Sequence, residues 1–307
     1  MFMESIVSVL RGFAMGAADI VPGVSGGTIA LVLGIYERLI ASVRAGSSAL
    51  GSIVRGDFGG FKRWMGAVDW MFIGPLLAGI LVAIVALAHV IEELLHNEPV
   101  LMASLFVGLV AGSMVIAWMM IRTPVVNHVW IAVGVGIVVF VALGLRSGTS
   151  EETVNQLADP ALWAFLLSGA IAICATILPG ISGSFVLVML GMYGAVLGAV
   201  TDRDITALGV FAIGAVIGLG LFAQFLHRML TEHHDAMLAG LVGLMAGSLR
   251  VLWPWPLGVD STDLGAPDSD IGLAILTAVI GFVVVLVIAR VAAGYERKRE
   301  ADASSDA

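Results

Sequence analysis

Charged side chains are scarce in this 307-residue chain, where they make up 12 % of the residues against 59 % for hydrophobic ones. Soluble domains carry about 25 % charged residues. Together with a mean hydropathy of +1.04, this scarcity excludes an ordinary water-soluble protein. Basic residues are the rarer charge, 15 against 23 acidic residues, which gives a net charge of −8. A nucleic-acid-binding protein needs a clustered basic surface, so no nucleic-acid partner is expected.

Cysteine is almost absent, and so are the usual ligand patterns for metals and nucleotides. Cys174 is the single cysteine, which excludes an intramolecular disulfide, and the histidines have no shared spacing that would gather metal ligands. No metal site and no cofactor are therefore expected. The phosphate-binding pattern Gly-x-x-x-x-Gly-Lys-Ser/Thr is also missing, so an activity driven by ATP is not expected.

Long apolar runs are what the sequence has in abundance. They extend over 17 to 25 residues between short polar segments, and a helix of about 20 residues crosses the roughly 30 Å of a bilayer core. Because backbone in lipid must satisfy its own hydrogen bonds, and because no alternating barrel pattern occurs, the runs predict an all-α integral membrane protein.

An internal repeat divides the chain in two. The segment from Pro22 to Tyr36 recurs 157 positions later, from Pro179 to Tyr193, with seven identities in fifteen positions. A second stretch, 108–113, recurs at 243–248, an offset of 135. Self-similarity of this kind indicates two homologous halves with one order of elements.

Each half is predicted to contain a motif-bearing helical pair followed by three transmembrane helices. The first half, 1–146, has the pair at 5–43 and helices at 67–91, 99–121 and 128–146. The second half, 161–293, has the pair at 161–200 and helices at 205–227, 236–252 and 271–290. A polar tail follows at 294–307. Three crossings per half make the second half inverted relative to the first.

Loop charge predicts the orientation, because positive residues accumulate on the cytoplasmic side. With the N-terminus inside, ten basic residues are cytoplasmic and three (Arg146, Arg203 and Arg250) are external. We therefore expect a multi-pass protein of the cell membrane with both termini cytoplasmic. The charge count does not distinguish a re-entrant pair from a pair that crosses twice. The Pro-Gly breaks at Pro22, Gly23, Pro179 and Gly180 favour re-entrant hairpins, since irregular backbone at depth needs an enclosed or wet cavity.

The broken motifs are suited to an anion. A helix that begins after Pro-Gly presents unpaired backbone N–H groups and its positive dipole end, and two inverted copies would aim two such ends at one site at mid-depth. The alternative is that the small residues only allow close helix packing. The predicted phosphate-binding residues are Ser25, Gly26, Gly27, Thr28, Ser182, Gly183 and Ser184.

Four ionisable residues flank the first motif. Charges inside apolar segments are costly and usually mark a pathway. Arg11 or Arg38 is predicted to assist phosphate binding, while Asp19 or Glu37 is predicted to carry a coupling proton or a sodium ion. The alternative for Glu37 and Arg38 is a solvated pair at the membrane interface. In the second copy Thr176, Gly194 and Ala195 replace Asp19, Glu37 and Arg38, so the two sites are chemically asymmetric.

These motifs resemble those of the prokaryotic polyprenyl-phosphate transporter family, and the similarity extends over nearly the whole chain. The residues that carry it are Gly16-Ala17-Ala18-Asp19-Ile20-Val21-Pro22-Gly23-Val24-Ser25-Gly26-Gly27-Thr28 and Leu178-Pro179-Gly180-Ile181-Ser182-Gly183-Ser184. The resemblance implies a transporter, not an enzyme, that returns undecaprenyl phosphate to the cytoplasmic leaflet for reuse in envelope synthesis. Its partners would be that polyprenyl-phosphate lipid, or a dolichyl-type phosphate in an archaeal host, and the surrounding membrane lipids.

Two other functions use similar elements. An ion-coupled carrier or channel for a small soluble anion needs the same anion-binding helix ends. A membrane polyprenyl-diphosphate phosphatase also has a Pro-Gly-x-Ser motif, but there arginine follows the serine and paired glutamates assist. In this chain glycine follows both Ser25 and Ser182, so phosphoryl chemistry lacks a charge-stabilising residue.

Overall fold

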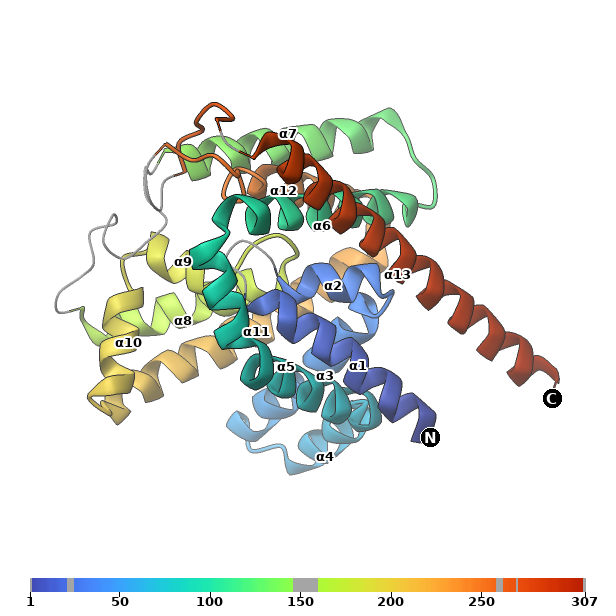
Figure 1. Ribbon diagram of the computed structural model, residues 1–307. Helices are drawn as coiled ribbons and strands as arrows, with labels where there is room; N and C mark the ends of the chain where they lie inside the picture. The colour runs from blue at the N-terminus through green and yellow to red at the C-terminus, as the bar shows by residue number, and fades with distance from the viewer. Residues whose placement is uncertain (1, 21–24, 146–159, 258–261, 269, 306–307) are drawn as a thin grey trace.

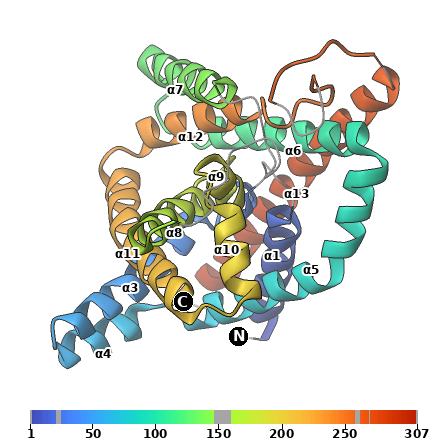
Figure 2. The ribbon, with the colours of Figure 1, turned by 90° about the vertical axis from the view of Figure 1, so that its left-hand side faces the viewer.

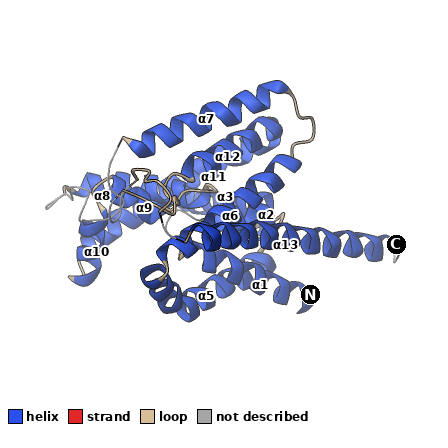
Figure 3. Ribbon diagram, turned by 45° about the horizontal axis from the view of Figure 1, so that its top comes forward, coloured by secondary structure: helices blue, strands red, loops and turns tan. Residues whose placement is uncertain are grey.

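The computed structural model describes residues 2–20, 25–145, 160–257, 262–268 and 270–305, and within these ranges it has no β-strand beyond one isolated bridge between Pro256 and Leu264. Figure 3 shows the helical architecture. This confirms the predicted all-helical class. The helices are α1 (Phe2–Asp19), α2 (Gly26–Val32), α3 (Tyr36–Val54), α4 (Phe58–Ala67), α5 (Trp70–Asn97), α6 (Pro99–Met119), α7 (Val126–Gly144), α8 (Leu162–Ile177), α9 (Gly183–Met189), α10 (Tyr193–Thr201), α11 (Ile205–Glu232), α12 (His234–Ser248) and α13 (Ile271–Ser305).

Five helices of the described chain are long and apolar enough to cross a membrane: α5, α6, α7, α11 and the Ile271–Val291 part of α13. The bent pair of α9 and α10 adds a sixth if it is one span. Helix α12 was expected at 236–252, but it has 15 residues, shorter than the roughly 20 that a full crossing needs. Helix α13 continues to Ser305 and so includes most of the expected polar tail.

Each motif-bearing pair is broken twice. The expected apolar segments after the Pro-Gly motifs are divided into α2 and α3 and into α9 and α10, and the latter two helices meet at 109°. Gly34 and Gly191, 157 positions apart, occupy these turns with φ of 69° each, a left-handed conformation that glycine adopts without strain. The short helix α4 was not expected.

Helix pairs pack through glycines at matching positions of the two halves. In α1, a Cβ on Gly12 would overlap the carbonyl oxygen of Leu76 in α5. In α8, a Cβ on Gly169 would overlap the carbonyl oxygen of Phe211 in α11. Gly169 follows Gly12 by 157 positions and Phe211 follows Leu76 by 135, the two offsets of the sequence repeat. The same backbone contact is therefore made twice.

The remaining long helices pair between the halves. A Cβ on Gly108 of α6 would overlap the carbonyl oxygen of Ala278 in α13. In the same way, a Cβ on Gly243 of α12 would overlap the carbonyl oxygen of Ala132 in α7. Helix α6 thus packs on α13 and α12 on α7. Figure 1 shows α6, α7 and α12 at one end of the molecule and α8, α9 and α10 along one side, the side that faces the viewer in Figure 2.

Candidate functional site

The first motif ends at a helix whose N-terminal amides are already bonded. Ser25 is the N-cap of α2, and its Oγ accepts a hydrogen bond of 3.1 Å from the Gly27 amide. The preceding amide, that of Gly26, donates to Oδ1 of Asp19 at 2.5 Å. A carboxylate therefore occupies the start of this helix. The predicted break residues Pro22 and Gly23 lie outside the described residues.

The second motif has a different pattern. Gly180, with φ of 89°, turns the chain after α8, and Ser182 precedes α9 without a side-chain capping bond. The Ser182 hydroxyl instead lies 2.8 Å from that of Ser184. Pro179 lies in the turn between the two helices.

Thr176 stands where the first half has Asp19, and it differs in its bonding. Its hydroxyl donates to the carbonyl oxygen of Ala172 at 2.9 Å, one turn back in the same helix. A Cβ on Gly183 would overlap this hydroxyl, so the two residues are in close contact, as Asp19 and Gly26 are. The two motifs thus share a geometry, but one carries a carboxylate and the other a neutral hydroxyl.

The two motifs contact each other directly through hydrogen bonds. The Ser25 hydroxyl donates to the carbonyl oxygen of Thr176 at 3.0 Å. In the other direction, the Gly180 amide donates to the Thr28 hydroxyl at 3.0 Å. Residues more than 150 positions apart in the sequence therefore satisfy each other's polar groups at the centre of the fold.

Close backbone approach accompanies these bonds. A Cβ on Gly27 would lie 2.6 Å from the carbonyl oxygen of Ile177, nearer than real Cβ atoms come, and the Tyr36 hydroxyl donates to the same oxygen at 3.3 Å. Ser25 and Thr28 are each 1 % exposed, whereas Ser184 is exposed. The hydroxyls that join the two motifs are thus buried in this conformation, whereas the Ser184 side chain at the edge of the contact is exposed.

Arg38 is bound away from the motifs. Its guanidinium donates to Oδ2 of Asp69 from Nε at 2.8 Å and from Nη2 at 2.5 Å, and it lies 3.3 Å from a Glu4 oxygen. It also stacks 4.3 Å from the centre of the Phe72 ring. These contacts join the starts of α1, α3 and α5. Arg11, half-buried on α1, precedes Asp19 by eight residues, about 12 Å along a helix.

Glu37 belongs to a polar network that sequence reasoning missed. Oε1 of Glu37 lies 3.1 Å from Nε2 of His234, and Nδ1 of His234 lies 3.0 Å from Oδ1 of Asp235. Asp235 also accepts from the amides of Arg122 and Thr123. The His234 bond, followed by those from Arg122 and Thr123, holds the pKa of Asp235 well below its usual range. Glu37 and His234 are 197 positions apart, so no local pattern signals this contact.

No group of three or more histidine, cysteine, aspartate or glutamate side chains in the described ranges is arranged to hold a metal ion. The polar groups at the centre are hydroxyls, amides and one carboxylate. Such a set can bind an anion through N–H and O–H donors, or a proton at the carboxylate.

Comparison with known proteins gives a consistent set of similarities. Residues 15–264 match the family described as VCA0040-like, undecaprenyl phosphate translocase-like. A polyprenyl-phosphate transporter of Vibrio cholerae is 40 % identical over 263 residues, covering 82 % of this chain and 79 % of that protein. A polyprenyl-phosphate transporter of Staphylococcus aureus is 29 % identical over 304 residues, covering 94 % and 98 %. No solved structure gives a significant match.

Proposed function

Because the chain belongs to the undecaprenyl phosphate translocase-like family, we propose that it moves a polyprenyl phosphate between the leaflets of the cell membrane. Both relatives carry the name of a transporter for that lipid and neither that of an enzyme, which agrees with the expectation of a transporter. The five long apolar helices supply the multi-pass membrane domain. The observation that carries the proposal is the direct contact of the two broken motifs at the centre of the fold.

The proposed architecture is a pair of inverted repeats with both termini in the cytoplasm. The glycine contacts that recur at the offsets of the sequence repeat support the duplication. The 109° bend between α9 and α10, and the matching turn at Gly34, support re-entrant pairs rather than pairs that cross twice. Inverted repeats with broken helices commonly place a substrate site at their interface.

In the proposed mechanism the phosphate binds between the motifs once they separate. Its donors would be the amides and hydroxyls of the two motifs, and its isoprenoid tail would remain in the lipid. In the closed conformation the Asp19 carboxylate holds the Gly26 amide, so phosphate must displace a negative charge. Protonation of Asp19 would weaken that bond and reduce repulsion toward the phosphate, which makes Asp19 the proposed coupling residue. Rocking of the two halves would then expose the site alternately to each leaflet.

Reconstituted vesicles test the proposed function against its alternatives. Movement of a labelled polyprenyl phosphate from one leaflet to the other is the expected result. Uptake of inorganic phosphate without lipid movement would instead identify a carrier or channel for a small anion. Release of phosphate from a polyprenyl diphosphate would identify a phosphatase.

Ser25→Ala is expected to lower the transport rate about thirtyfold. The change leaves the Gly27 amide and the Thr176 carbonyl without their partner; each lost bond is worth about 1 kcal/mol, and 1.4 kcal/mol corresponds to a factor of ten. Ser104→Ala is the matched control, because Ser104 is equally buried but bonds only to its own helix. Equal rates in both variants would remove Ser25 from the site.

Arg38→Ala tests whether this arginine assists the phosphate or only joins helices. Asp69→Asn weakens the same ion pair while keeping an oxygen to cap α5. A partly exposed pair is worth about 0.2–1 kcal/mol, so Asp69→Asn is expected to change transport by less than about fivefold. A loss of at least tenfold in Arg38→Ala alone indicates contact with phosphate. Equal losses in the two variants would assign Arg38 a purely structural role.

A further inference from the structure

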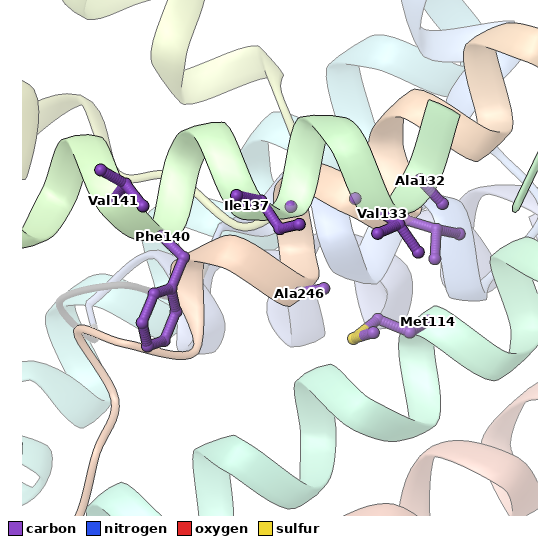
Figure 4. Close-up of a pocket in the computed structure, with 10 residues that line it drawn as sticks. Met114, Ala132, Val133, Ile137, Phe140, Val141 and Ala246 are labelled. Atoms are coloured by element: carbon purple, nitrogen blue, oxygen red, sulfur yellow. The ribbon is translucent and has the colours of Figure 1, made fainter. Parts of the chain in front are cut away.

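An apolar groove of about 460 Å³ lies between α6, α7 and α12, away from the two motifs. Its walls include Met114, Val133, Ile137, Phe140 and Ala246. In Figure 4 these side chains face the space beneath α7, and Phe140 hangs from α7 at one end of it. The volume is within the range of about 300–1,000 Å³ that is typical of small-molecule sites.

The groove exists because small residues line its floor. Gly136, Gly243 and Ala246 meet where α7 crosses α12. Ala132 of α7 contacts Gly243 in the same way as Ala278 of α13 contacts Gly108. Positions on α7 therefore correspond to positions on α13 that are 146 residues later. At that offset the position of Gly136 on α7 corresponds to Phe282 on α13. A small residue that lines the hollow on α7 thus has a large counterpart on α13.

A cation lies against Phe140, the residue at one end of the groove. The guanidinium of Arg250 lies 4.8 Å from the centre of the Phe140 ring and presses against Gly144, where a Cβ would overlap it. Its Nε donates to the carbonyl oxygen of Thr262 at 3.0 Å. The Asp263 carboxylate, 4.0 Å away, forms an ion pair with this guanidinium. With its side chain 15 % exposed, Arg250 is a largely buried positive charge beside an apolar hollow.

The corresponding residue of the other half is Val115, 135 positions earlier. The charge therefore lies beside the same helix pair, α7 and α12, as the hollow, and an apolar groove with a cation against its end residue Phe140 is complementary to a lipid with an anionic head. Helix α7 is mostly exposed along its length, so the groove opens sideways to hydrocarbon and a lipid can enter without crossing water.

The second motif lies on the opposite side of α12 from the groove. On the other face of that helix, Met245 and Ser248 lie against Gly180: a Cβ on Gly180 would be 2.9 Å from the Ser248 hydroxyl and 3.0 Å from the Met245 Cα. Only the thickness of one helix, about 10 Å, separates the groove from the Pro-Gly turn.

We propose that this groove binds the isoprenoid chain of the carrier lipid, with the lipid phosphate at Arg250, before the head group reaches the motifs. The inference rests on the proposed function and adds a second position on the lipid's path. The phosphate can accept from the guanidinium N–H groups, while the methyl-branched chain fills the hollow beneath α7. The isoprene units next to the phosphate are then recognised in the groove, and the phosphate is recognised twice.

Binding of two lipids that differ only in chain length tests the proposal. The purified full-length protein is titrated with undecaprenyl phosphate and with geranyl phosphate, which has only two isoprene units. Ala246→Phe fills the groove, and Val138→Phe adds the same ring to an exposed position of α7 that does not line it. Ala246→Phe is expected to weaken binding of the long lipid at least tenfold and binding of the short lipid, whose two isoprene units make fewer contacts in the groove, by a smaller factor. Val138→Phe is expected to affect neither.

Two further variants keep the result decisive. Ile137 is 59 % exposed and lines the groove, so Ile137→Trp obstructs it without burial strain, should Ala246→Phe fail to fold. Arg250→Gln is expected to reduce the preference for undecaprenyl phosphate over undecaprenol about tenfold. One contrary result is that the wild-type protein binds the long lipid and that all three variants, Ala246→Phe, Ile137→Trp and Val138→Phe, bind it equally well. That result would overturn the proposal that the groove binds the isoprenoid chain, but it would leave the proposed function standing. Failure of the wild-type protein to bind undecaprenyl phosphate overturns both.

Discussion

Gly27→Ala is expected to abolish lipid transport. The new methyl group would lie 2.6 Å from the carbonyl oxygen of Ile177, so α2 and the end of α8 must move apart and the bonds of Ser25 and Thr28 across the motifs must lengthen. Overpacking of this kind costs about 1–3 kcal/mol. The weakening of the hydrogen bonds between the two motifs adds to this cost. Leaflet-to-leaflet movement of labelled lipid in vesicles measures the effect.

Gly240→Ala provides the control for this change. Gly240 is in the interior of α12 with nothing within 4 Å of an added Cβ, and alanine is better than glycine in a helix by about 0.5–1 kcal/mol. This variant is expected to transport like the wild-type protein and to melt at the same or a higher temperature. Wild-type transport by Gly27→Ala would show that the two motifs need not touch.

Asp19→Asn is expected to tighten binding of polyprenyl phosphate and to remove the response of transport to a pH gradient. The amide keeps an oxygen for the Gly26 amide but carries no charge, so the phosphate displaces a weaker hydrogen bond and meets no repulsion. Hydrogen bonds to charged groups contribute about 1.5–3 kcal/mol and neutral ones about 1 kcal/mol, which predicts a gain of about tenfold in affinity. Binding titrations and transport in vesicles with and without a pH gradient measure the two effects.

Asp57→Asn is the matched control, because Asp57 caps α4 through the Gly60 amide in the same way and lies far from the motifs in sequence. It is expected to leave both measurements unchanged. A pH response in Asp19→Asn equal to that of the wild-type protein would exclude Asp19 as the coupling residue and direct attention to Glu37 and its contact with His234.

The sequence predicted the long helices well because apolar runs of that length have few alternatives in lipid. It did not predict the second break in each motif-bearing pair, since Gly34 and Gly191 are single glycines with apolar residues directly on both sides. Their equal spacing from the two Pro-Gly motifs was a signal that the repeat contained. Helix α4 was missed because Phe58–Ala67 is short and lies in a segment that resembled a loop.

The candidate site was partly accessible from the sequence. Duplication of the motifs predicted that Ser25 and Ser182 belong to one site, and the structure brings the two motifs into contact. The partners of the charged residues were not predictable, because each of them is distant along the chain. Arg38 binds Asp69 and Glu4, and Glu37 binds His234, through contacts that only the folded arrangement of α1, α3, α5 and α12 creates.

The pairing of α6 with α13 constrains how the chain is made. Gly108 of α6 has its backbone partner at Ala278, a residue that leaves the ribosome 170 positions later. Until then the glycine face of α6 lacks the helix that packs against it in the folded protein, and such faces allow close approach of two backbones. The pair of α6 and α13 can therefore form only after Ala278 has been synthesised.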